Sequence, residues 1–300
     1  MPKKITNFTI KFCIYFLLVC VSYIYLLPLL RMISFMFISR ADLMDPAVDW
    51  IPRSISTRNI RVAFDVLNVP ETLINSIWFS ALLAGAQTFV SALTGYAFAR
   101  FNFRFKKVLF VLLLATFIMP VPVVLIPRLI LFLEIHSITG IQMIGTPIPQ
   151  VLMAAMGQGV NSTILILIFY SFLKLIPYSL DEAAMIDGAS VRQIFWHIII
   201  KMSLTTILVV FLFSFVWNWN ETYQTSTFLR RGVELLPQRL ALFENLFYGA
   251  VAGTEARDAL INEAYRMSAT FVTIAPLLIL YAFVQRQFIS GIESTGITGE

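Results

Sequence analysis

Six stretches of this sequence contain no charged residue, and each is long enough to hold a helix that crosses a lipid bilayer. They cover residues 12–30, 72–99, 108–127, 137–173, 202–220 and 267–285. Gly and Pro interrupt the fourth stretch, so we expect its helix near residues 150–173. A spanning helix needs about 20 apolar residues, and it satisfies its own backbone hydrogen bonds where no water is present. The sequence therefore predicts an all-α integral membrane protein with six transmembrane helices.

The composition agrees with a membrane protein and argues against nucleic-acid binding. Of the 300 residues, 58% are hydrophobic and 13% are charged. A water-soluble domain of this size needs more charge on its surface. The formal net charge of +5 is typical of basic cytoplasmic loops in a membrane protein. We therefore expect membrane lipid, and not nucleic acid, as a partner.

The few cysteines and histidines give no sign of a metal centre. Cys13 and Cys20 lie seven residues apart in one apolar stretch. On a helix they stand roughly 10 Å apart along the axis, too far to form a disulfide with each other. The two histidines, His136 and His197, have no CxxC or HExxH spacing around them. We expect no metal site and no catalytic residue in this chain.

The basic residues predict which side of the membrane each loop faces. Lys3, Lys4 and Lys11 precede the first stretch, and four basic residues crowd the short loop 100–107. Short basic loops remain in the cytoplasm. Six helices put both termini and the segment 178–195 on that same side, with the longer connections outside. The prediction is a multi-pass protein of the bacterial cytoplasmic (inner) membrane with cytoplasmic N- and C-termini.

The segment 178–195 is polar between two apolar stretches, and its pattern predicts two short helices. Ser179 and Glu182 fit the S-x-x-E capping box, in which the serine caps the helix start. Gly188 can end this helix in the left-handed conformation. Ser190 and Gln193 repeat the box as S-x-x-Q and start a second helix. From the residues alone, an ordinary capped loop and a docking helix are equally good interpretations.

The same segment resembles the EAA motif in permease subunits of binding-protein-dependent ABC importers. The matching residues are Glu182, Ala183, Ala184, Gly188, Ile198 and Ile200. Other stretches are similar to the carbohydrate branch of these permeases, which is MalG-like. They include Asn75-Ser76, residues 95–100 and 119–122, Trp219-Asn220-Glu221, Gln285-Arg286 and Gly291.

The resemblance implies a type I ABC importer permease fold with a cytoplasmic coupling helix. The residues implied in ATPase coupling are Glu182, Ala183, Ala184, Asp187 and Gly188. The implied function is ATP-driven import of an oligosaccharide or related carbohydrate, and this chain would form half of the pathway. The chain has no G-x-x-x-x-G-K-[ST] sequence of its own, so it is not the ATP-binding subunit.

The implied partners are a second, MalF-like permease, two ATPase subunits and an extracytoplasmic solute-binding protein. ATP and Mg²⁺ would be used by the ATPase, and no cofactor is expected on this chain. We expect an N-terminal helix and first external loop over 1–70, a permease core over 71–290 and a cytoplasmic tail over 291–300. Within the core, the EAA loop covers about 178–198, and an external loop covers about 218–267. The family usually has a proline where this chain has Lys201, so we expect a straighter start to the fifth span.

Several other polar and aromatic residues are candidates for contact with the cargo or with the binding protein. They are Asn161, Trp219, Asn220, Tyr248 and Gly249. Interhelical hydrogen bonding is the alternative for Asn161. An interfacial aromatic belt is the alternative for Trp219. A helical lid over the outer gate is the alternative for residues 248–253.

Two rival functions are open at this point. A secondary transporter driven by an ion gradient would need paired charges within the spans, and the predicted spans contain none. A membrane enzyme would need clustered acids, histidines or a metal set. An ABC permease for another solute, such as glycerol-3-phosphate, is also open. The lack of Lys and Arg in the predicted spans favours neutral or uronic sugars.

Overall fold

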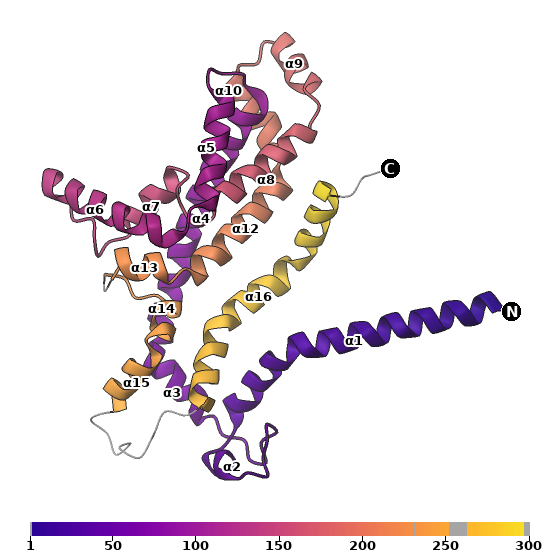
Figure 1. Ribbon diagram of the computed structural model, residues 1–300, viewed down its shortest axis with the longest axis vertical. Helices are drawn as coiled ribbons and strands as arrows, with labels where there is room; N and C mark the ends of the chain where they lie inside the picture. The colour runs from indigo at the N-terminus through magenta and orange to yellow at the C-terminus, as the bar shows by residue number, and fades with distance from the viewer. Residues whose placement is uncertain (1, 231, 252–262, 297–300) are drawn as a thin grey trace. The chain divides into compact units, whose positions relative to one another are not determined.

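The computed structural model describes residues 2–230, 232–251 and 263–296, and helices make up most of them (Figure 1). The chain divides into two compact units. One contains Met1–Val69 and Leu242–Pro276, and the other contains Pro70–Ala241 and Leu277–Glu300. The first unit holds α1 (Pro2–Phe37), α2 (Arg40–Met44), α3 (Arg58–Leu67), α15 (Phe243–Val251) and the first part of α16 (Glu263–Gly296).

The second unit holds almost all of α4 and the helices that follow it up to residue 241. They are α4 (Val69–Arg100), α5 (Lys106–Ile118), α6 (Val121–Thr139), α7 (Ile148–Ala155), α8 (Ser162–Leu175), α9 (Ser179–Ile186), α10 (Val191–Ile194), the π-helix Phe195–Ile199, α11 (Ile200–Met202), α12 (Leu204–Asn220), α13 (Tyr223–Phe228) and α14 (Leu236–Ala241).

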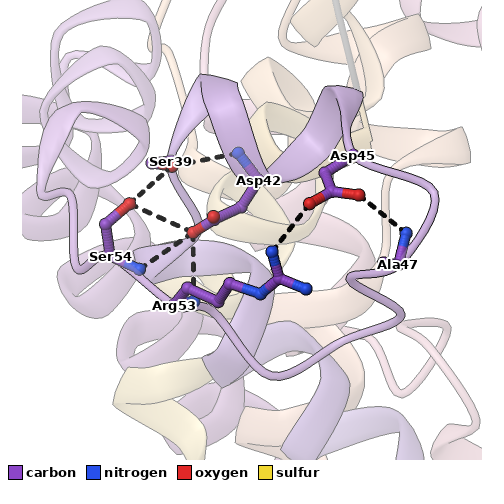
Figure 2. Close-up of polar contacts among 6 residues, drawn as sticks. All are labelled: Ser39, Asp42, Asp45, Ala47, Arg53 and Ser54. Carbon is purple, nitrogen blue, oxygen red and sulfur yellow. Dashed lines mark hydrogen bonds and ion pairs between the residues drawn. The ribbon is translucent and has the colours of Figure 1, made fainter.

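In the first unit, a hydrogen-bonded loop follows α1 and leads to α3. The Asp42 carboxylate accepts hydrogen bonds from the backbone N–H groups of Arg53 and Ser54, at 3.1 and 3.0 Å, and from the Ser54 hydroxyl (Figure 2). The backbone hydrogen bond from Ser54 is the main cause that lowers the pKa of Asp42, because it stabilises the ionised form. Nη1 of Arg53 also forms a salt bridge with Oδ2 of Asp45, at 2.8 Å, within the same loop. The loop is thus held by its own polar groups.

In the second unit, α4, α5, α8 and α12 lie alongside one another, and α6 extends away from them, to the left in Figure 1. A glycine permits the closest approach between α4 and α8. A Cβ added at Gly95 would lie 2.6 Å from Cβ of Phe169 and 3.0 Å from the nitrogen of Tyr170. A larger residue would therefore push the two helices apart, as expected where small residues mediate helix packing in membranes.

The apolar core of this unit joins the long helices to the polar segment. It contains Ala92 and Tyr96 from α4, Leu165, Phe169 and Leu173 from α8, Ile176, Ile194 from α10, Phe195 and Ile199 from the π-helix, and Val210 from α12. Ala184 and Ala189 pack against it. The ends of α4 and α8 are therefore in direct packing contact with the segment between α8 and α12.

Two predicted spans are interrupted, and the bounds of both need correction. The third stretch, 108–127, breaks at Pro120, where α5 ends and α6 begins. Pro120 has an extended backbone and caps α6, because proline cannot continue a helix from the residue before it. The helix expected at 150–173 is also wrong: α7 ends at Ala155, and α8 starts only at Ser162.

The structure also does not show the straighter start expected for the fifth span. The segments Val191–Met202 and Leu204–Asn220 meet at an angle of 77°. Ser203 lies at the bend with φ −93° and ψ 8°, directly after the π-helix and α11. A π-helical turn is a known cause of sharp kinks without proline. The chain therefore bends here although Lys201 replaces the usual proline.

Within the described residues, four helices are long and apolar enough to cross a membrane. They are Ile10–Phe37, Val69–Arg100, Val121–Thr139 and Glu263–Gln285, and the number rises to six if each of two bent helix pairs counts as one span. Many of their large apolar side chains are exposed, such as Phe12, Leu17 and Ile24 on α1. Such continuous apolar surface is suited to lipid. The six-span count remains a prediction.

Candidate functional site

The polar segment between α8 and α12 forms the helix–glycine corner–helix arrangement that its sequence predicts. The axes of α8 and α9 differ by 73°, and Pro177 lies between them. At the other end of α9, Gly188 has φ +82°. Its N–H donates to the Met185 carbonyl, at 3.0 Å, and the Ala189 N–H donates to the Ala184 carbonyl, at 2.9 Å. This is a Schellman motif with glycine at the left-handed position, so the predicted positive φ is confirmed.

The two predicted capping boxes differ in outcome. Ser190 accepts a hydrogen bond from the Gln193 N–H, and the Gln193 side chain accepts one from the Ser190 N–H at 2.8 Å. This capping box is confirmed. The prediction for Ser179 is wrong: the residue before α9 is Tyr178, already in helical conformation, and no side chain caps the helix start. The turn begins one residue earlier because the Tyr178 carbonyl already accepts from the N–H of Asp181.

One face of α9 is exposed and the other packs on the core. Glu182, Ala183 and Asp187 are exposed, while Ala184 is half-buried against the core. Ile186 is 86% exposed, compared with 44% for Met185 and 40% for Leu180 on the same helix. A large apolar side chain this exposed on a helix is typical of a surface that docks into a partner.

A buried ion pair fastens α9 to the end of α4. The Nε atom of Arg100 lies 2.9 Å from Oδ2 of Asp181, and the two side chains are only 7% and 1% exposed. Burial raises the pKa of the Asp181 carboxyl, and the positive charge of Arg100 opposes this shift. Nη2 of Arg100 also donates to the Ile176 carbonyl at 3.0 Å, and its guanidinium lies over the Tyr178 ring, 5.7 Å from the centroid.

A second polar group, at the opposite end of α8, is a buried hydrogen-bond network centred on Gln87. Its Nε2 donates to the Val160 carbonyl and to the Ser162 hydroxyl, both at 2.9 Å. Its Oε1 accepts from Ser214, at 2.7 Å, and from Asn218, at 2.6 Å. This network joins α4, the start of α8 and α12, so Gln87 connects three helices through buried hydrogen bonds.

A cavity of about 200 Å³ lies beside this network. Its lining comes from the end of α5, the first turns of α6, the loop 157–161, the start of α8, and Gln224 on α13. Arg128, in α6, donates from Nη2 to Oε1 of Gln158 at 3.1 Å. Asn161, one of the predicted candidates, lines the cavity with a left-handed backbone at φ +51°. Arg128 lies beyond the predicted third span, but inside a helix apolar enough to cross a membrane.

The remaining predicted contact residues are not gathered at this cavity. Trp219 is 3% exposed and packs on Phe215 with the ring centroids 5.9 Å apart, so its ring is not presented to a ligand. Asn220 is exposed, and its side chain donates to the Val216 carbonyl in its own helix. Tyr248 and Gly249 belong to α15 in the other unit rather than to a loop tip. Residues 252 and 253 of that predicted tip lie outside the described residues.

Comparison with known proteins identifies the class. The family model described as the inner membrane component of binding-protein-dependent transport systems matches residues 87–294. The match covers more than half of the chain, which therefore belongs to this family. The protein is thus a membrane permease subunit of an ABC importer and not an enzyme, and it works with a separate ATPase and a solute-binding protein.

Relatives of similar length support this conclusion. The chain is 24% identical to the probable starch degradation products transport system permease protein AmyC of Thermoanaerobacterium thermosulfurigenes, covering 94% of this chain and 95% of that one. It is also 24% identical to the polygalacturonan/rhamnogalacturonan transport system permease protein YtcP of Bacillus subtilis, covering 93% of each. A crystal structure of a bacterial ABC transporter involved in import of the acidic polysaccharide alginate has a chain with the same fold. Its TM-score is 0.73 at 19% identity, covering 94% of this chain and 97% of that chain.

Sequence reasoning missed three residues of the candidate site. Arg100 was recognised only as part of a basic loop, and Asp181 only as an acidic neighbour of the motif. They are 81 positions apart, so no local pattern pairs them. Ile186 could have been considered from the sequence, because it is a large apolar residue directly before Asp187 in a segment rich in polar residues.

Proposed function

We propose that this chain forms half of the translocation pathway of an ATP-driven carbohydrate importer and that α9 is its coupling helix. The observation that carries the proposal is the way in which α9 is attached to the ends of α4 and α8. Its outer face is exposed, while the Arg100–Asp181 ion pair and the packing of Ala184 fix its inner face to the ends of α4 and α8. A force applied to α9 by an ATPase would therefore reach these long helices directly.

The proposal assigns contact with the ATPase to Glu182, Ala183, Asp187 and Ile186, and assigns the corner to Gly188. Ala184 packs inward and would position the helix. The small side chain of Ala183 leaves room for close approach of another protein's backbone. ATP and Mg²⁺ would be bound by the ATPase, which would drive the helices of the permease between inward-facing and outward-facing states.

The proposed assembly contains a second, MalF-like permease and two ATPase chains, with both termini of this chain in the cytoplasm. Carbohydrate cargo is supported by relatives whose names refer to starch products and to pectic polysaccharides and by the alginate importer of similar fold. Their named cargoes include neutral and acidic sugars, so the relatives leave the charge of the cargo open.

The experiment is reconstitution with its controls. The chain alone in liposomes should take up no sugar against a gradient, whereas the chain with its partner permease, the ATPase and a loaded binding protein should do so when ATP is supplied. Uptake by the chain alone, driven by a proton or sodium gradient, would instead support a secondary transporter.

Orientation is tested separately, in a background lacking Cys13 and Cys20. A membrane-impermeant thiol reagent applied to intact cells should label Ser56→Cys and leave Ser190→Cys unlabelled. Labelling of Ser190→Cys would overturn the cytoplasmic assignment of the α9 segment.

A further inference from the structure

We propose that the cavity at Arg128 binds the carboxylate of an acidic sugar, so that this chain contacts its cargo directly. The inference rests on the proposed function and narrows it to a chemical class of cargo. It places cargo recognition at the start of α8, at the opposite end of that helix from the coupling segment.

The guanidinium of Arg128 has N–H donors that make no hydrogen bond to the described residues. Among the residues that the structure describes, it donates one hydrogen bond, to the neutral amide of Gln158, whereas a guanidinium carries five N–H donors in a planar fork. Among the described residues, no carboxylate lies within salt-bridge distance of it. An arginine in so apolar a helix is costly, which indicates a functional role. Its fork matches a carboxylate with two parallel hydrogen bonds.

The rest of the cavity is suited to sugar hydroxyl groups. Uncharged polar side chains line it: Thr116, Gln158, Asn161, Thr163 and Gln224. Amides and hydroxyls both donate and accept hydrogen bonds, as sugar hydroxyls do. Pockets for drug-sized ligands start at about 300 Å³. A cavity of about 200 Å³ therefore suits one sugar residue, either alone or at the end of a longer chain.

Hydrogen bonds from Gln87 hold one wall of the cavity in place. Gln87 fixes the Val160 carbonyl and the Ser162 hydroxyl. A Cβ added at Gly159 would lie 2.4 Å from Nε2 of Gln87, so a larger residue there would displace the Gln87 side chain from its hydrogen bonds. Preorganised walls of this kind reduce the entropy cost of binding.

The single positive charge of Arg128 favours a carboxylate over a phosphate as the bound group. The cavity offers a single cation among neutral groups. A sugar carboxylate carries one negative charge, whereas a phosphate monoester carries about 1.5 to 2 at neutral pH. One arginine neutralises the charge of the carboxylate, whereas it leaves part of the phosphate charge uncompensated among neutral groups.

The test uses the full complex of this chain with its partner permease and ATPase in lipid nanodiscs, without the binding protein. Binding of D-galacturonate, D-galactose and galactose 6-phosphate is measured by saturation-transfer NMR. The first two sugars differ only in carboxylate against hydroxymethyl, so they isolate the charge. The wild-type complex should bind galacturonate at least about tenfold more tightly than either of the other two.

Three variants test whether Arg128 causes the preference for galacturonate over galactose. Arg128→Gln should abolish the preference for galacturonate over galactose, and Arg128→Lys should keep part of it, since a cation remains without the fork. Arg58→Gln, which removes an exposed arginine in the other unit, should change nothing. Loss of the preference in all three variants would overturn the assignment to Arg128.

Two wild-type results would also overturn the inference: equal binding of galacturonate and galactose, or tighter binding of galactose 6-phosphate. Failure of the proposed function would look different. In that case no ATPase would co-purify with the wild-type chain, whatever the sugar preference of the cavity.

Discussion

Replacing Asp181 with asparagine should release α9 from the end of α4 while leaving the helical bundle intact. The change keeps the size of the side chain and removes its charge. It leaves the Arg100 guanidinium buried, with the Ile176 carbonyl and the Tyr178 ring as its remaining contacts. A buried cation without its anion is strongly unfavourable, so the segment should move to let Arg100 reach water.

The expected cost follows from burial. The side chains are 7% and 1% exposed, and removing one member of such a buried pair costs about 3–5 kcal/mol. The surviving contacts of Arg100 favour the lower end of this range. A cost of about 3 kcal/mol would lower the ratio of docked to undocked α9 by roughly 100-fold. Global stabilities lie at about 5–15 kcal/mol, so the protein should still fold.

The assay is co-purification of the ATPase with the permease, together with membrane abundance and ATP-dependent sugar uptake. Asp181→Asn should lose most of the bound ATPase and most of the uptake at nearly normal abundance. Asp65→Asn makes the same chemical change at an exposed position in the other unit and should behave as wild type. The double variant Arg100→Met, Asp181→Leu replaces the pair with apolar side chains and should recover much of the ATPase binding.

The reasoning would be refuted if Asp181→Asn bound the ATPase and transported sugar like the wild type. A double variant that is no better than the single one would show that charge itself, rather than the position of α9, is what the site requires.

Three further variants have definite expected outcomes. Gly188→Asp places a side chain at φ +82°, a strain of about 1 kcal/mol or more; it should reduce ATPase co-purification with little loss of abundance, and unchanged co-purification would argue against the corner's role. Ile186→Ser removes an exposed apolar side chain; it should weaken ATPase affinity about tenfold, measured by titration of the complex, without lowering the melting temperature. Gly159→Ala should displace Gln87 and destabilise the protein by about 1–3 kcal/mol in thermal unfolding, whereas Gly85→Ala, with nothing within 4 Å of the added Cβ, should not.

What could be predicted from the sequence was mostly local. The left-handed Gly188 and the Ser190–Gln193 capping box depend on residues within five positions of each other, and both are confirmed. The cap at Ser179 is wrong although its pattern is as good. The helical conformation of Tyr178 sets where the helix starts, and the S-x-x-E pattern carries no information about it.

Long-range features were not predictable from one sequence. The pairing of Arg100 with Asp181 and the Gln87 network both depend on how distant helices meet. Trp219 was a candidate for contact with the cargo, with an interfacial aromatic belt as the alternative, but packing against Phe215 buries its ring. The bend at Ser203 arises beside a π-helical turn. No residue pattern in the sequence predicts this turn.

Site-directed cross-linking tests the docking of α9 on the ATPase most directly. In a background lacking Cys13 and Cys20, a single cysteine replaces Ile186, and a thiol-reactive photo-cross-linker is attached in the assembled complex. The matched control is a cysteine in place of Ile138, which is also highly exposed, at 77%, near the end of α6. The account predicts a cross-link to the ATPase from position 186 and none from position 138. An intact complex that cross-links to the ATPase from position 138 and not from 186 would contradict the assignment of α9 as the coupling helix.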